Sequence, residues 1–138
     1  MTPVREQKYR KEYGSDLAEI AGGDLESARA LFLSQKGRKE NVLYLCQQAL
    51  EKGLKGLLCA LDEPIPHTHD LVFLSDRVGR CKKIPFDYDL RLLNDFAAIR
   101  RYEKGFLELT NDDLDEVLKL SDQVLQWLTT EIRDLLKT

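Results

Sequence analysis

The most constraining feature of this sequence is the segment from Asn41 to Leu61, in which apolar and polar residues alternate with the period of an α-helix. When each residue is placed at steps of about 100°, the apolar side chains fall on one arc, which predicts a core-facing surface. That arc comprises Val42, Cys46, Ala49, Leu50, Gly53, Leu54, Leu57, Ala60 and Leu61. Because glycine costs roughly 1 kcal/mol relative to alanine inside a helix, Gly53 in the middle of the arc predicts the close approach of a neighbouring helix.

The opposite arc of the same helix is polar and carries Tyr44, Gln48, Glu51, Lys52 and Lys55. Glu51 and Lys55 are spaced i, i+4 in the order that favours an ion pair. Two interpretations remain open from the residues alone. The simpler one is a solvated surface with one weak ion pair, and the functional one is the border of a groove or of a subunit contact.

The rest of the chain also shows helical spacing, and runs of β-branched and aromatic residues typical of strands are almost absent. We therefore predict an all-α fold, an antiparallel up-down bundle of about five helices. Gly22-Gly23 leaves open whether residues 15–36 form one helix or two, and Asp24 is a candidate cap for a second piece. Residues 1–23 are expected to be an N-terminal arm or extra helix, and residues 24–138 the bundle. The further helices are expected over 70–78, ending at Gly79, over 87–102, and over 111–136 after a Thr110–Asp113 capping box.

The composition fits one globular domain, with 43% hydrophobic and 33% charged residues among 138. A net charge of −3 argues against a protein that coats nucleic acid by charge alone, but it leaves room for a local basic groove. Three cysteines without metal-ligand spacing indicate reduced thiols and a cytoplasmic protein. No run approaches the ~18 apolar residues that a membrane span needs, so we expect no membrane association.

Three motifs, in order along the chain, resemble those of the HEPN domain. The run Gln48-Ala-Leu-Glu-Lys-Gly-Leu-Lys-Gly-Leu-Leu58 is similar to its central helix. Pro66-His-Thr-His-Asp-Leu71 resembles its turn into the third helix, and Arg101-Tyr102 resembles the end of its fourth. The resemblance covers about residues 24–136. It implies a helical bundle that commonly forms a homodimer and binds nucleotides or RNA. Many members of the family are RNases. Many also pair with a minimal nucleotidyltransferase in toxin–antitoxin or regulatory modules.

The same resemblance implies a ligand-binding surface in which Lys and Arg hold phosphates and Tyr102 stacks on a base. The candidate residues are Gln48, Glu51, Lys52, Lys55, His69, Asp70, Arg101 and Tyr102. The family pattern favours Arg101 as the functional arginine, whereas helical periodicity leaves Arg100 closer to the apolar arc. That choice stays open.

One departure from the family pattern limits the predicted activity. Catalytic HEPN members carry an arginine followed, after four to six residues, by a histidine, but residues 100–109 contain no histidine. Neither Tyr102 nor Glu103 replaces an imidazole that titrates near neutrality. We therefore expect a non-catalytic module. The alternatives are an RNase of variant chemistry that uses Arg101 with His69 or Glu51, and a purely structural dimerisation domain.

Two further features of the sequence bear on function. Leu120 and Trp127 lie beside the core stripe of the last helix, and they are either a wide core face or a subunit contact. His67 and His69 have no third ligand nearby, so we expect no metal site. Instead, Thr68 or His69 is expected to cap the third helix, and His69 to bond a neighbouring helix. No glycine-rich phosphate loop is present, and no cofactor is expected.

Overall fold

The computed structural model describes residues 4–90, 93 and 108–137. Within this part the chain is mostly helical, as the sequence predicts. The helix predicted over 87–102 falls largely on residues outside the described ones. The elements are β1 (Glu6–Gln7), α1 (Tyr13–Ser34), α2 (Lys39–Ala60), β2 (Ile65–Pro66), α3 (Leu71–Cys81) and α5 (Asn111–Leu136).

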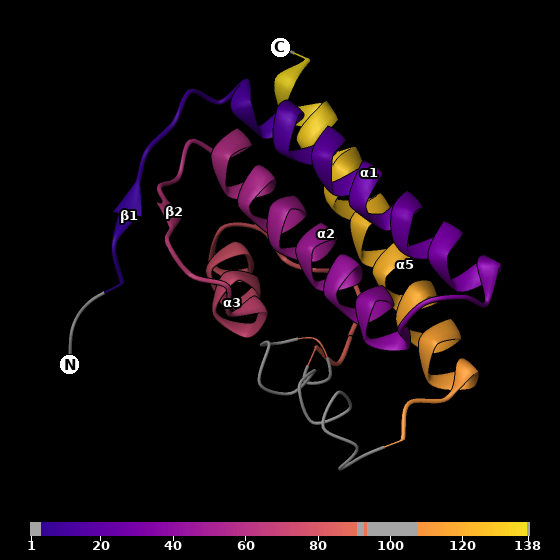
Figure 1. Cartoon of the computed structure of the whole chain (residues 1–138). Helices are drawn as coiled ribbons and strands as arrows, with labels where there is room; N and C mark the ends of the chain where they lie inside the picture. Colours follow the sequence, from indigo (N-terminus) through magenta and orange to yellow (C-terminus); the bar gives the residue numbers. More distant parts are fainter. Residues whose placement is uncertain (1–3, 91–92, 94–107, 138) are drawn as a thin grey trace.

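Three long helices, α1, α2 and α5, pack side by side, and the short helix α3 lies against α2 (Figure 1). Helix α2 contacts each of the other three, so it is the centre of the fold. The predicted apolar arc of α2 is buried, apart from Leu61, which is partly buried against the core. The opposite arc is not a solvated surface, because Glu51 in its middle is only 5% exposed.

Helix α1 is one continuous helix that passes through Gly22-Gly23 without a break. Asp24 therefore lies in the middle of a helix and caps nothing. The helix ends at Ser34, where Gln35 adopts a left-handed conformation with φ 55° and its N–H donates to the Phe32 carbonyl. No helix in the described part of the chain is both long and apolar enough to cross a bilayer.

Two close helix contacts depend on glycine. A Cβ atom at Gly53 would lie 2.8 Å from Cδ1 of Leu125 on α5, which confirms the close approach predicted there. A Cβ atom at Gly14 would lie 2.6 Å from the carbonyl oxygen of Gly56, so α1 and α2 approach each other backbone to backbone. Gly22 and Gly23 differ, because a Cβ atom at either would have no neighbour within 4 Å.

The N-terminal arm includes a short strand, β1. β1 pairs antiparallel with β2, with Glu6 opposite Pro66 and Gln7 opposite Ile65. The pairing is extended by the His67 N–H, which donates to the Arg5 carbonyl at 2.7 Å. The arm is thereby attached to the connection between α2 and α3 (Figure 1).

The N-terminal cap of α5 is the one that the sequence predicts, whereas that of α3 is a different residue. Thr110 and Asp113 form the predicted capping box of α5, and their hydrogen bonds lower the pKa of the Asp113 carboxyl. Helix α3 is instead capped by Asp70, whose Oδ1 accepts from the Phe73 N–H at 3.0 Å. The prediction of Thr68 or His69 as this cap was therefore wrong. The helix also continues through Gly79 to Cys81, beyond its predicted end.

The glycine contacts give a matched pair of substitutions within α1. We expect Gly14→Ala to destabilise the protein by about 2 kcal/mol or more, because the new methyl group overlaps rigid backbone. Gly22→Ala is expected to stabilise it by up to about 1 kcal/mol, because alanine favours the helix and nothing obstructs its side chain. Urea unfolding followed by circular dichroism measures both. Equal effects of the two substitutions would contradict the close approach at Gly14.

Candidate functional site

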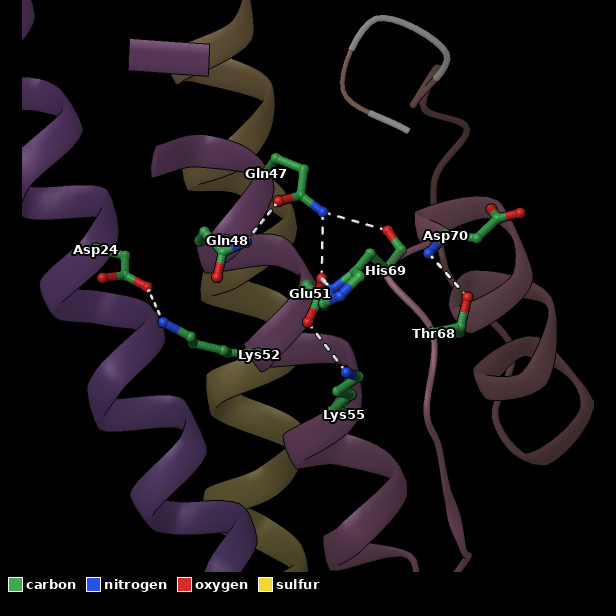
Figure 2. A network of polar contacts seen from close by, with 9 residues as sticks. All are labelled: Asp24, Gln47, Gln48, Glu51, Lys52, Lys55, Thr68, His69 and Asp70. Carbon is green, nitrogen blue, oxygen red and sulfur yellow. Dashed lines mark hydrogen bonds and ion pairs between the residues drawn. The ribbon is translucent and has the colours of Figure 1, made fainter. Parts of the chain in front are cut away.

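The carboxylate of Glu51 is buried in the middle of α2 and is bound on both oxygens (Figure 2). Its Oε1 accepts from Gln47 Nε2 at 3.2 Å and lies 2.8 Å from His69 Nδ1. Its Oε2 lies 3.0 Å from the Lys55 amino group, which confirms the predicted i, i+4 pair. A buried carboxylate is costly unless it is paired and hydrogen-bonded, and this set of partners meets both requirements.

His69 combines a fixed position with an exposed surface. Because an ionised carboxylate only accepts hydrogen bonds, Nδ1 of His69 donates to Glu51. The backbone carbonyl of His69 also accepts from Gln47 Nε2 at 3.2 Å. Nevertheless, 68% of the His69 side chain is exposed. His69 bonds a neighbouring helix, as predicted, and it presents an oriented imidazole at the surface.

Gln47 is a member of this cluster that the sequence analysis missed. It is fully buried and links three groups, since its Oε1 also accepts from Gln48 Nε2 at 2.9 Å. The available signal was its i, i+4 spacing to Glu51, which allows a glutamine–carboxylate hydrogen bond within one helix. Through Gln47, the structure brings Gln48, Glu51, Lys55 and His69 together. These five residues are called the Glu51 cluster below.

Two of the predicted site residues point elsewhere. Lys52 turns toward α1, where its amino group lies 2.6 Å from Asp24 Oδ2 (Figure 2). Asp70 directs its carboxylate to the N-terminus of α3 as the helix cap. Arg101 and Tyr102 lie outside the described residues. Of the eight predicted ligand-binding residues, the described part of the chain therefore brings together four, which are Gln48, Glu51, Lys55 and His69.

Leu120 and Trp127 are both partly buried and pack against the core. The Trp127 ring meets Phe86 edge-on, with ring centroids 6.2 Å apart and an interplanar angle of 85°. This packing explains both residues as part of a wide core face. A subunit contact through them stays a prediction.

Cys46 belongs to the apolar arc of α2 and is fully buried. Burial raises the pKa of its thiol to about 11, so the reactive thiolate is scarce at neutral pH. Cys46 therefore lacks the exposed, electropositive surroundings of a nucleophile.

Substitutions at the buried and at the exposed members of the Glu51 cluster are expected to lower the free energy of unfolding by different amounts. Glu51→Gln should lower the free energy of unfolding by about 1–3 kcal/mol, because Lys55 loses the anion that compensates its partly buried charge. His69→Gln should cost less than about 1 kcal/mol, because the imidazole is mostly exposed. Urea titration measures both, with Glu19→Gln on the exposed side of α1 as the control. If His69→Gln lowered the free energy of unfolding as much as Glu51→Gln does, the distinction between a buried and an exposed member would be contradicted.

A family model of the HEPN domain matches residues 15–132, which include α2 and α3 and most of α1 and α5. The match includes every residue of the Glu51 cluster. No curated protein and no solved structure matches the chain significantly.

Proposed function

This chain belongs to the HEPN family, and from that premise we propose that it is a non-catalytic module that binds a nucleotide or RNA. Membership itself indicates a nucleotide- or RNA-related or regulatory function. The observation that carries the proposal is the Glu51 cluster, in which a buried carboxylate holds His69 and Lys55 at one surface. Side chains fixed before binding lose little conformational entropy when a ligand arrives, so such a surface is suited to recognition.

The charges of the cluster define what it contributes to binding. Lys55 is compensated by Glu51, and Lys52 by Asp24, so neither lysine is an isolated cation. His69 and Gln48 would act mainly through hydrogen bonds to a ligand. We propose that Arg101 supplies phosphate recognition and Tyr102 base stacking, on the basis of the family pattern.

The non-catalytic part of the proposal rests on the sequence between residues 100 and 109. This run has no histidine, so the usual HEPN arrangement of arginine and histidine is incomplete. We further propose a homodimer with a toxin–antitoxin-like regulatory role and a minimal nucleotidyltransferase as partner. A cytoplasmic location is supported by Cys46, Cys59 and Cys81, which are all free thiols.

A second candidate function is favoured by the geometry of His69. An imidazole whose Nδ1 is bonded to a carboxylate is held in one tautomer, which is how general acid–base catalysts are oriented. An RNase of variant chemistry would use this imidazole together with Arg101.

We expect the purified protein to bind mixed RNA in the presence of EDTA without cleaving it. His69→Gln should weaken binding by about tenfold, the effect of losing one good polar contact, while the folded fraction stays unchanged. Fluorescence anisotropy with labelled RNA measures the affinity, and gel electrophoresis detects cleavage. Glu19→Gln serves as the control in both assays.

The two other hypotheses give different results in the same assays. Cleavage that disappears in both Arg101→Ala and His69→Gln, but persists in Glu19→Gln, would establish the variant RNase. A protein that elutes as a dimer and whose melting temperature no nucleotide or RNA shifts would support the purely structural domain.

A further inference from the structure

The N-terminal arm, residues 4–12, is a basic segment in an acidic protein. It carries Arg5, Lys8, Arg10 and Lys11 against Glu6 and Glu12, whereas the whole chain has a net charge of −3. The arm lies before residue 15, where the family match begins. Its charge is therefore a feature of this chain outside the matched domain.

Backbone hydrogen bonds attach the arm to the segment that carries His69. Arg5 accepts from the N–H of His67, two residues before His69, and the β1–β2 pairing continues from there. At its other end, the carbonyl of Arg10 accepts from the thiol of Cys59 at 3.0 Å. The arm thus runs from the C-terminal end of α2 along β2 (Figure 1), and its Arg5 end is bonded to the chain two residues before His69.

Three of the four cations on the arm are available to a ligand. Lys8 lies 3.5 Å from Asp62, and Glu6 is occupied by Arg77 at 2.9 Å. The other three are exposed and form no ion pair within the described part of the chain. They are Arg5, Arg10 and Lys11.

An aromatic pair lies at the end of the arm that carries Arg10 and Lys11, where the Tyr13 N–H donates to the Arg10 carbonyl. Tyr13 is 38% exposed, and its ring packs on Tyr9 with centroids 5.2 Å apart at 36°. Tyr9 is in turn partly buried against Leu17, Cys59 and Ile65. Contact with the partly buried Tyr9 ring therefore restricts the motion of the Tyr13 ring.

We propose that the arm is a binding track for single-stranded RNA that leads to His69. This inference rests on the proposed function, and it specifies a strand of several nucleotides in place of a free nucleotide. Cations that follow a backbone, together with an exposed aromatic ring on which a base stacks, are what sequence-tolerant single-strand binding requires. At about 3.3 Å per extended residue, the arm from Arg5 to Arg10, which precedes the turn at Lys11, spans up to about 16 Å, more than one nucleotide.

The test compares two triple variants with the same change in charge. The arm variant is Arg5→Gln, Arg10→Gln and Lys11→Gln. The control is Lys36→Gln, Lys39→Gln and Arg133→Gln, all exposed positions outside the arm. Tyr13→Ala tests the stacking separately, and thermal melting verifies that each variant is folded.

We expect the affinity of the wild-type protein to rise from a labelled three-nucleotide oligoadenylate to one of twelve nucleotides. The arm variant should lose most of this gain, and the control should keep it. The slope of log affinity against log salt should fall by about 0.7 for each lost phosphate contact. Tyr13→Ala should weaken binding of the longer strand by about tenfold, as expected for one stacked base.

Each failure has a different meaning. If the wild-type protein binds neither strand, the proposed function fails and the arm proposal fails with it. If it binds but the arm variant matches the control in both length dependence and salt slope, only the arm proposal fails. If polyaspartate displaces the RNA as well as unlabelled oligoadenylate does, the arm is a general surface for polyanions, including acidic proteins, and the proposal is overturned.

Discussion

The carboxylate of Glu51 imposes the strictest requirement on this structure, because Glu51 lies in the middle of the central helix and this residue is only 5% exposed. An ion removed from water in this way costs several kcal/mol unless opposite charge and hydrogen bonds surround it. Helix α2 supplies Gln47 and Lys55 from its adjacent turns, but one position on Oε1 is taken by His69. The connection to α3 must therefore pass directly over α2.

This requirement explains why the polar face of α2 is partly covered, in addition to its apolar face. An amphipathic helix usually packs its apolar stripe on a core and leaves its polar face in water. Here α1 and α5 cover the apolar arc, and glycines allow them to approach closely. The middle of the polar arc, at Glu51, is covered by the connection before α3, whose His69 bonds Glu51 through its ring and Gln47 through its backbone carbonyl. The helix is thus held by apolar packing on one side and by hydrogen bonds on the other.

The features that could be predicted from the sequence are those that local spacing determines. The Glu51–Lys55 pair, the Thr110 capping box and the close approach at Gly53 each follow from a few residues within one helix. The cap of α3 was missed because Thr68, His69 and Asp70 are adjacent and all able to cap, and only the three-dimensional path of the chain selects Asp70. The β1–β2 pair was missed because two-residue strands have no periodicity. The spacing of Gln47 to Glu51 is local, but the burial of Glu51 and the bond from Gln47 to the His69 carbonyl depend on the connection before α3, which no local spacing determines.

The position of His69 depends on two anchors that differ in origin. On one side, Glu51 and Gln47 hold its ring and its carbonyl, and both residues lie within the matched HEPN region. On the other side, the preceding residues 65–67 pair with the N-terminal arm, which lies outside that region. A connection fixed at both ends has little freedom to move the imidazole away from the carboxylate. The geometry of the candidate surface is consequently a property of the whole chain, because a segment beyond the family domain helps to position the residue at its centre.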